Sequence, residues 1–441
     1  MNNKIIISKK IEPFNKDILI EGDKSLSIRW ALLASQASGK SKSYNLLKSE
    51  DVINTLKCLK KLGVRSRIKG NICEIFGEGL NGYKYINKLE LDAGNSGTLG
   101  RLILGLLIHS PVKIKIKGDK SLSNRDFSRI TQPLKKFGAH FKSNSGKLPI
   151  EIKGVRDAKR IYYLENKGSA QIKSSVMLAA LNTKGTTIIK AKKSRNHTEL
   201  LFKHLKLPIK IFKNKNFDII KITGKKKIKT LNYNIPSDIS SSAFFIILTI
   251  LSNDSKLKIK NVNINPTRIG VLKILKLMNI GVKIKNTKTY KGEKVGDLLI
   301  KSQKKIKPIN CPSSLNSAAI DEFLLIFLIA AKADGISYFK KISELNQKES
   351  PRLKWGSKIL NKMGIKTIVT KDSIKIFGNP KLKIKKNITI KNFLKDHRVF
   401  MTSIIAALTF GGNWTIYDKD SINTSFPSFL KKIKDIGGKF D

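Results

Sequence analysis

The stretch that decides the fold is residues 55–63, which read TLKCLKKLG. Its apolar residues fall at helical spacing, so it predicts an amphipathic helix that ends in a lysine-rich turn, an apolar residue and a glycine. Lysine at a helix end is favourable beside the negative pole of the macrodipole, and glycine just past the end adopts a left-handed cap easily. We expect an alternating strand to follow.

The same pattern recurs along the chain. It ends at Gly63, Gly138, Pro208 (a degenerate copy), Gly281, Gly364 and Gly437, which are 75, 70, 73, 83 and 73 residues apart. Six units of roughly this length account for the whole chain and combine strands with crossover helices, which predicts an α/β (α+β) fold. Solenoids also show long periods. Because each unit carries its own strands and helices, we favour two compact, pseudo-symmetric domains of three units each.

Length and apolar content agree with two cores. The chain has 441 residues, of which 40% are apolar, and single cores stop growing beyond about 250–300 residues. The sequence has no run of apolar residues long enough for a membrane span and no recognisable signal peptide. Its three cysteines, Cys58, Cys73 and Cys311, have no metal-ligand spacing. This pattern indicates a cytoplasmic chain without a structural disulfide or a metal.

The net charge is extreme. Lysine and arginine number 87 against 32 acidic residues, a formal charge of +55, which usually suggests a polyanionic partner. The lysines, however, are spread over the chain and alternate with Ile or Leu at 113–117 and 381–385, which predicts strands with one solvated face. Aromatic residues are only 7%. We therefore interpret lysine as the ordinary surface residue and keep nucleic-acid binding as an alternative function.

One motif occurs twice. Residues 22–29, GDKSLSIR, return as residues 118–125, GDKSLSNR. In the first copy, Ser25 or Asp23 is expected to cap an apolar helix whose free N–H groups favour anions. Lys24 adds a point charge and Arg29 a planar fork suited to phosphate or carboxylate. A capped helix with a solvated lysine is the plainer alternative.

A glycine-rich loop gives a second candidate anion site. Residues 92–101, DAGNSGTLGR, open an apolar helix, and glycines let a ligand approach the backbone closely. The glycine spacing is neither the dinucleotide fingerprint nor a Walker loop. A literal GxGxxG at Gly77, Gly79 and Gly82 is followed by no amphipathic helix, so we interpret it as a turn between strands.

Arginine is rare and clustered in motifs. Seven of the 12 arginines lie in motif-like segments: Arg29, Arg101, Arg125, Arg195, Arg268, Arg352 and Arg398. Lysine does not replace arginine where two N–H groups bind one anion. Carboxylates stand before helices at Asp321-Glu322 and at Glu349, where the ordinary role is a cap and the alternative is a catalytic base. His397, just before another helix, is more often a capping or structural histidine than a catalyst.

Taken in order, these segments resemble the EPSP synthase family over essentially the whole length. The matching runs are residues 22–29, 92–98, 118–125, 169–174 (SAQIKS), 194–199 (SRNHTE), 236–243 (PSDISSSA), 265–268 (NPTR), 321–323 (DEF), 348–352 (KESPR), 396–398 (DHR) and 424–427 (TSFP). Any single run is modest evidence. Eleven in the right order are specific.

The resemblance implies a fold of six βαβαββ units in two domains, an enolpyruvyl transferase-like inverse α/β barrel. One domain would hold residues 22–238, and the other residues 1–21 and 239–441, with the active site in the cleft between them. The implied reaction adds the 5-hydroxyl of shikimate 3-phosphate to phosphoenolpyruvate and then eliminates phosphate. It supplies aromatic amino acid and chorismate biosynthesis and needs no cofactor. The family habit is a cytoplasmic monomer that binds neither nucleic acid nor membrane.

The resemblance also implies residue roles. Phosphoenolpyruvate would contact Lys24, Gly97, Arg125, Gln171, Arg352 and Arg398. Shikimate 3-phosphate would contact Lys24, Ser25, Arg29, Ser169, Ala170, Gln171, Ser194, Asp321 and Lys348. Asp321 would take the proton of the 5-hydroxyl, and Glu349, with Lys24 as the rival, would handle the proton at the methylene carbon. Gly97 matches the position at which the family is sensitive to glyphosate.

Some positions depart from the family pattern: Ile28, Asp126, Asn346, Pro351 and Thr424. They affect substrate contacts and the glyphosate response rather than a core catalytic position. The nearest alternative is the sister family, UDP-N-acetylglucosamine enolpyruvyl transferase, which uses a reactive cysteine in a mobile loop. The matching region, residues 117–130, contains no cysteine.

Overall fold

The computed structural model describes residues 3–224 and 226–441, and these form two compact units. The first unit comprises Gly22–Ile235 with Tyr290–Glu293. The second comprises the residues up to Glu21 with Pro236–Thr289 and Lys294–Asp441. Residues 1, 2 and 225, which fall inside the predicted domains, lie outside the described residues. Each unit buries an apolar core of its own.

The described part of the first unit contains three four-stranded sheets. Their strands, in spatial order, are β14 (Tyr233–Asn234), β3 (Ser38–Tyr44), β5 (Ile72–Glu78) and β4 (Arg65–Lys69); β6 (Leu89–Asp92), β7 (Lys113–Lys117), β9 (Ile150–Lys153) and β8 (His140–Ser143); and β10 (Tyr162–Glu165), β11 (Thr186–Lys192), β13 (Phe217–Thr223) and β12 (Ile209–Lys213). In each sheet the first two strands are parallel and the others pair antiparallel.

The described part of the second unit has two four-stranded sheets and one three-stranded sheet. Their strands are β16 (Lys283–Tyr290), β17 (Glu293–Lys301), β15 (Lys256–Asn263) and β2 (Asn15–Leu19); β18 (Asn310–Cys311), β19 (Ile336–Phe339), β21 (Ile374–Phe377) and β20 (Thr367–Val369); and β1 (Lys4–Ile7), β23 (Asn413–Tyr417) and β22 (Asn387–Ile390). Each of these sheets also contains one parallel pair.

The order of elements confirms the predicted α/β fold of six βαβαββ repeats. In the repeats that begin with β6, β10 and β18, one helix connects the parallel strands and a second helix leads to the antiparallel hairpin. Three sheets take a strand from a distant part of the chain, because β14 pairs with β3, β2 pairs with β15 and β1 pairs with β23. Of these strands, β14 and β2 lie where the chain passes from one unit to the other.

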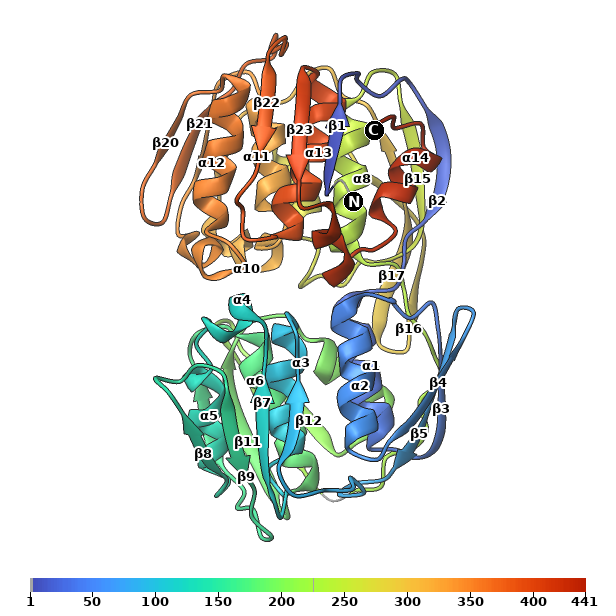
Figure 1. Ribbon diagram of the computed structural model, residues 1–441, viewed down its shortest axis with the longest axis vertical. Coiled ribbons are helices and arrows are strands. Elements are labelled where there is room, and N and C mark those ends of the chain that lie inside the picture. The colour runs from blue at the N-terminus through green and yellow to red at the C-terminus, as the bar shows by residue number, and fades with distance from the viewer. Residues whose placement is uncertain (1–2, 225) are drawn as a thin grey trace. The chain divides into compact units, whose positions relative to one another are not determined.

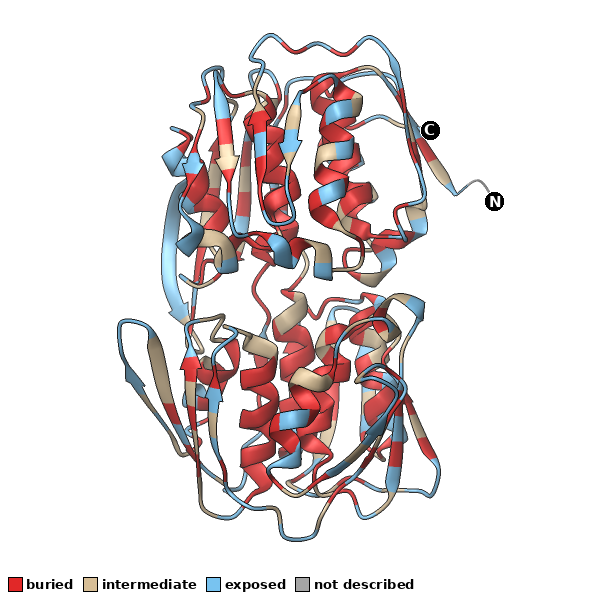
Figure 2. Cartoon of the chain, turned by 90° about the vertical axis from the view of Figure 1, so that its left-hand side faces the viewer, coloured by how far each residue is buried: buried red, intermediate tan, exposed pale blue. Residues whose placement is uncertain are grey.

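The helices fall into two classes. The crossover helices are buried on nearly all sides (Figure 2), as expected for helices that are apolar all round. They are α1 (Lys24–Ser35), α3 (Gly97–Leu106), α6 (Ala170–Asn182), α8 (Ile239–Leu251), α11 (Phe323–Ala331) and α13 (His397–Phe410). Within the second unit, α8, α11 and α13 contact one another (Figure 1).

The second helix of each repeat is amphipathic and covers one side of a sheet. These helices are α2 (Glu50–Lys61), α5 (Ser128–Lys135), α7 (His197–His204), α9 (Gly270–Leu277), α12 (Arg352–Met363) and α14 (Phe429–Asp435), and the short elements are α4 (Lys120–Ser123), α10 (Asn316–Ala319), η1 (Ser313–Leu315), η2 (Ser343–Gln347) and η3 (Lys419–Thr424). The left-handed residue predicted after the helix is glycine at Gly63, Gly138, Gly364 and Gly437. In the other two repeats it is Lys206 or Asn279.

One predicted strand is wrong. Residues 113–117 form β7, but residues 381–385 form no strand. Leu382 and Ile384 are nevertheless buried between exposed lysines. The alternation therefore indicates an extended segment with one apolar face. A β-strand also requires a neighbouring strand to pair with, and alternation does not supply one.

Burial also describes the cysteines and the apolar helices. Cys58, Cys73 and Cys311 are free and buried. Burial raises the pKa of Cys58 and of Cys73 to about 12 and that of Cys311 to about 11. Among the described residues, no single helix is long and apolar enough to cross a membrane, although the bent pair Ser313–Ala319 and Phe323–Ala331 passes by length and composition alone.

Candidate active site

The first repeated motif opens α1 in the first unit. Asp23, rather than Ser25, is the cap, because its Oδ1 accepts from the backbone N of Leu26 at 2.9 Å. Lys24 Nζ lies 2.9 Å from Asp51 Oδ2 in the first turn of α2. The sequence analysis gave Asp51 no role. The signal that the sequence carried was an acidic residue at a helix start in a chain dominated by lysine.

Arg29 stands one turn further along α1 and is held on several sides. Its Nε donates to Thr198 Oγ1 at 2.9 Å, its Nη1 to Ser25 O at 3.1 Å and its Nη2 to Ser174 Oγ at 3.3 Å. Ser174 and Thr198 also bond each other at 2.7 Å. Arg29 is only 5% exposed, so the direction of its guanidinium is fixed by α6 and α7 rather than by solvent.

The glycine-rich loop forms the start of α3. Ser96 caps the helix, and Arg101 Nη1 donates to Gln171 Oε1 at 2.7 Å. Gln171 Nε2 in turn donates to Thr98 Oγ1 at 3.1 Å. A Cβ atom placed on Gly97 would lie 2.8 Å from Arg101 Nη1 and 3.2 Å from Arg125 Nη1. The absence of a side chain at Gly97 therefore leaves room for two guanidinium groups.

The remaining first-unit residues lie at the start of α6 and before α7. Ser169 caps α6 and accepts from the backbone N of Ile172 at 3.4 Å, and Ala170 is the first helical residue. Arg125 follows α4, and its Nη2 lies 3.5 Å from Ser121 Oγ. The Oγ of Ser194 is shielded from solvent and has no hydrogen-bond partner in the described residues. A hydroxyl in this state suits a polar ligand.

The second-unit residues form a separate charged cluster. Asp321 Oδ1 lies 3.4 Å from Lys348 Nζ and 3.7 Å from Arg352 Nη1. The backbone O of Asp321 accepts from Arg398 Nη1 at 2.6 Å. Arg352 Nη2 also donates to Glu349 Oε2. The structure therefore brings together all five second-unit residues predicted for the site.

Asp396 holds the side chain of Arg352 and the backbone of Arg398, and the sequence analysis gave it no role. Its Oδ2 accepts from Arg352 Nε and from Ser350 Oγ, each at 2.8 Å, and its Oδ1 accepts from Arg398 N at 2.9 Å as the cap of α13. Burial alone would raise the pKa of Asp396, but the adjacent Arg352 charge outweighs it and holds that pKa below its ordinary value. Asp396 is thus a permanent carboxylate.

The capping roles expected of other carboxylates are wrong. Neither Glu322 before α11 nor the segment before α12 makes a side-chain cap. Glu322 instead accepts from Ser240 Oγ and lies 3.9 Å from Arg398 Nη1. Ser240 Oγ also accepts from Arg268 Nη2 at 2.9 Å. In the second unit the charged side chains therefore satisfy one another, because burial makes unpaired charges costly.

Helix N-termini supply most of the predicted residues in both units. In the first unit these are α1, α3 and α6, and in the second α11, α12 and α13. Free N–H groups and the positive pole of the macrodipole favour anions there. The described residues include no group of three His, Cys, Asp or Glu side chains placed to hold a metal ion.

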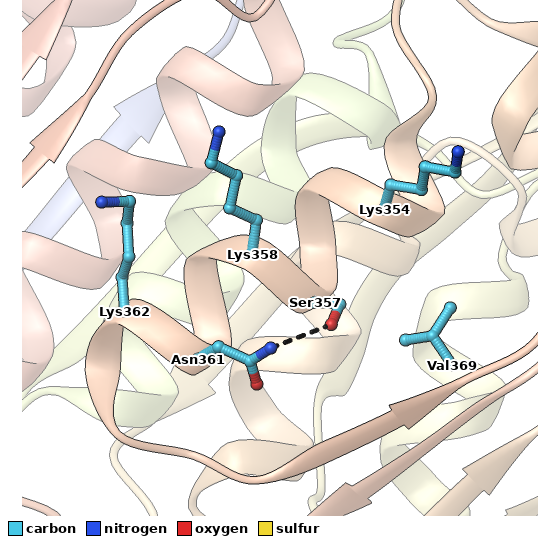
Figure 3. A pocket seen from close by; sticks show the side chains of 6 residues that line it. All are labelled: Lys354, Ser357, Lys358, Asn361, Lys362 and Val369. Atoms are coloured by element: carbon cyan, nitrogen blue, oxygen red, sulfur yellow. Dashed lines mark hydrogen bonds between the residues drawn. The ribbon is translucent and has the colours of Figure 1, made fainter.

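A groove of about 490 Å³ lies elsewhere, between α12 and β20, and contains none of the predicted residues. Lys354, Lys358 and Lys362 line it together with Ser357, Asn361 and Val369. Figure 3 shows that the three ammonium groups do not converge on one point, and that Asn361 bonds Ser357, at 3.4 Å. We interpret this row as a solvated helix face.

Known proteins similar to this chain point to one family. The family model for EPSP synthase (3-phosphoshikimate 1-carboxyvinyltransferase) matches residues 8–433. A 3-phosphoshikimate 1-carboxyvinyltransferase from Ruthia magnifica subsp. Calyptogena magnifica is 40% identical over 419 residues, covering 95% of this chain and 94% of that protein.

Solved structures agree. EPSP synthase from Acinetobacter baumannii superimposes with a TM-score of 0.87 at 32% identity over 99% of both chains. The enolpyruvyl transferase NikO from Streptomyces tendae shares the fold at 13% identity, with a TM-score of 0.78 over 100% of this chain and 99% of that one. On its sequence, its six repeats and these similarities, the chain belongs to the EPSP synthase (3-phosphoshikimate 1-carboxyvinyltransferase) family.

Proposed function

We propose that this chain transfers the enolpyruvyl group of phosphoenolpyruvate to the 5-hydroxyl of shikimate 3-phosphate, giving EPSP and inorganic phosphate. The observation that carries the proposal is the cluster of Asp321 with Lys348, Arg352 and Arg398, which stands on the motif positions that match the family. It combines one carboxylate suited to a base with cations suited to a phosphorylated substrate.

Shikimate 3-phosphate is assigned to the helix starts of the first unit. Arg29 presents a fixed guanidinium, and Lys24, Ser25, Ser169, Ala170, Gln171 and Ser194 complete the set, with Asp321 and Lys348 from the second unit. An arginine already held by Thr198 and Ser174 loses little rotational freedom when it binds an anion. The shielded Ser194 hydroxyl supplies a donor to the same substrate.

Phosphoenolpyruvate carries a phosphate and a carboxylate, and arginine is the side chain best matched to both. We assign it to Lys24, Gly97, Arg125 and Gln171 of the first unit and to Arg352 and Arg398 of the second. Arg352 is held by a carboxylate that stays ionised, which fixes the plane of its guanidinium. We further propose that both units act on one substrate pair and that the protein works as a cytoplasmic monomer.

The chemistry is an addition followed by an elimination. Asp321 accepts the proton of the 5-hydroxyl while the hydroxyl oxygen bonds to C2 of phosphoenolpyruvate. A proton is delivered to C3 in the same addition. The tetrahedral intermediate then loses a proton from C3. The bond between C2 and the phosphate oxygen breaks, which restores the double bond. We assign the C3 proton to Glu349, with Lys24 as the rival, and the arginines stabilise the charge that develops on the leaving phosphate.

Release of inorganic phosphate tests the proposal. Purified protein is given shikimate 3-phosphate and phosphoenolpyruvate together and each alone, and release is expected only with both. Asp321→Ala and Arg125→Ala should abolish it. Two variants are the matched controls. Asp334→Ala removes an exposed aspartate that follows the C-terminus of α11, and Arg129→Ala removes a partly exposed arginine paired with Asp126.

The other functions predict different results. Release with UDP-N-acetylglucosamine in place of shikimate 3-phosphate would move the chain to the sister activity. A nucleic-acid-binding protein would instead bind many sites per nucleic acid chain, with an affinity that falls steeply with salt. No release with either acceptor would overturn the proposed function.

A further inference from the structure

The turn of one hairpin does not belong to the unit that contains its strands. β16 and β17 lie in a sheet of the second unit, whereas Tyr290–Glu293, which form the turn, belong by their contacts to the first unit. Lys291 and Gly292 both have positive φ, at 48° and 88°, as a two-residue turn of this hand requires. Residues 283–289 are exposed, but the turn is half-buried or buried.

Four contacts of this turn lie within the first unit. Tyr290 accepts from the backbone N of Asn234 at 2.9 Å, and its ring centroid is 5.5 Å from that of Tyr233. Lys291 Nζ donates to the backbone O of Asn232. A Cβ on Gly292 would lie 3.0 Å from the backbone O of Leu200 in α7, so the turn packs closely against that helix.

The fifth contact is a hydrogen bond between two side chains with no access to solvent. Glu293 Oε1 lies 2.7 Å from His197 Nδ1, and the two side chains are 0% and 1% exposed. A glutamate side chain is rarely buried this completely unless another polar group pairs with it. The pair joins the hairpin turn to the first residue of α7, which directly follows the Ser194–Asn196 segment.

The next two residues of α7 connect this turn with the predicted substrate residues. Thr198 Oγ1 accepts from Arg29 Nε and bonds Ser174. Glu199 Oε1 lies 2.5 Å from Lys173 Nζ, and those two side chains are 4% and 1% exposed. Three consecutive side chains of one helical turn are therefore anchored to three elements: the hairpin turn, α1 and α6.

We propose that Glu293 is a positioning residue for shikimate 3-phosphate: it holds His197, so the first turn of α7 keeps the register in which Thr198 aims the Arg29 guanidinium. Glu293 touches neither substrate. It acts through α7, and its effect is therefore selective for the substrate assigned to Arg29. This inference rests on the proposed function for the identity of that substrate.

Kinetics of Glu293→Ala test the proposal. The KM for shikimate 3-phosphate is expected to rise about tenfold, the scale of one misaligned charge-assisted hydrogen bond, while the KM for phosphoenolpyruvate changes by less than about threefold. Glu293→Gln keeps an oxygen that accepts from His197 and should restore most of the loss. Equal rises in both KM values, or no rise in either, would overturn the proposal.

Asp297→Ala is the matched control. Asp297 is a carboxylate four residues further along β17, and its partners Asn261, Asn286 and Lys258 all belong to the second unit. This variant should leave the KM for shikimate 3-phosphate unchanged. If it raises that KM as much as Glu293→Ala does, the effect comes from a loosened hairpin and the positioning role falls.

A double-mutant comparison tests the route through Thr198. In a Thr198→Val background, adding Glu293→Ala should raise the KM for shikimate 3-phosphate by less than about twofold, because the interaction it acts through is already lost. A full tenfold rise in that background contradicts the route. Should Glu293→Ala not fold, Glu293→Asp shortens the side chain by one methylene, keeps its charge and should show the same selective rise.

Calorimetric titration with shikimate 3-phosphate alone separates this inference from the proposed function. Weaker binding of shikimate 3-phosphate in Glu293→Ala supports the positioning role, whether or not the wild type releases phosphate. If the wild type binds this substrate but releases no phosphate, only the assigned reaction is overturned. Normal turnover with unchanged binding in Glu293→Ala overturns only the positioning role. A wild-type chain that neither turns over nor binds shikimate 3-phosphate overturns both.

Discussion

Asp396 offers the sharpest test of how the second unit holds its arginines. Its carboxylate is fully buried, caps α13 and bonds Arg352 and Ser350. Removing one partner of a buried ion pair costs about 3–5 kcal/mol, and loss of a helix cap costs about 1 kcal/mol. Asp396→Ala is therefore expected to lower the free energy of unfolding of this unit by about 4–6 kcal/mol.

Tryptophan fluorescence during urea unfolding measures this loss in the correct unit. Trp355 and Trp414 lie in the second unit and Trp30 in the first, so a Trp30→Phe background reports on the second unit alone. Asp396→Asn retains an oxygen that caps the helix but loses the charge, and should recover only the capping part. Asp435→Asn, an exposed partner of Lys431, is the control, with a cost below about 1 kcal/mol.

The pH dependence has a definite sign. Because the folded pKa of Asp396 lies below its ordinary value, its contribution is complete above the unfolded pKa of about 3.9 and is lost as the pH falls through the folded pKa. The wild type should therefore lose stability in acid more steeply than Asp396→Asn. A cost within about 1 kcal/mol of zero for Asp396→Ala would refute the reasoning, because no buried pair would then be holding Arg352.

Three further predictions concern the site. Gly97→Ala places a methyl 2.8 Å from Arg101 Nη1. It should raise the KM for phosphoenolpyruvate about tenfold and weaken competition by glyphosate. Unchanged inhibition by glyphosate would contradict this. Arg29→Lys keeps the charge but cannot bond Ser174 and Thr198 at the same time. The affinity for shikimate 3-phosphate, measured by calorimetry, should therefore fall about tenfold or more. Wild-type affinity would show that the planar guanidinium group is not required. Iodoacetamide at neutral pH should leave activity intact and label Cys58, Cys73 and Cys311 only after unfolding, since burial raises their pKa values to about 12, 12 and 11; inactivation of the folded protein would reveal a reactive thiol.

The repeat was available from the sequence because its cause is local. A helix with one apolar face, lysine at its end and a left-handed residue after it is set by neighbours within a few residues. The six endpoints therefore predicted six repeats, and α11 spans the expected residues 323–331. The segment at 381–385 shows the limit, since its alternation was correct but a strand also needs a partner, and no strand of the described residues pairs with it.

The candidate site residues were predicted by type and order, but their partners were not. Asp51, Thr198, Asp396 and Glu322 are ordinary polar residues in the sequence, and their importance arises because distant segments place them beside Lys24, Arg29, Arg352 and Arg398. Which carboxylates cap helices and which pair with arginine depends on burial, because a buried charge takes the strongest partner within reach. Sequence position does not encode that reach.

The sequence by itself determined the repeat, the fold class and the family, because periodicity, helix ends and eleven ordered motifs are all properties of neighbouring residues. Only the tertiary structure decided that β14 and β2 complete sheets begun elsewhere, and that the Tyr290–Glu293 turn seats Glu293 against His197. Those pairings join residues separated by 96 or more positions along the chain. Their energy comes from burial and hydrogen bonding between these distant segments, which exist only after the chain has folded.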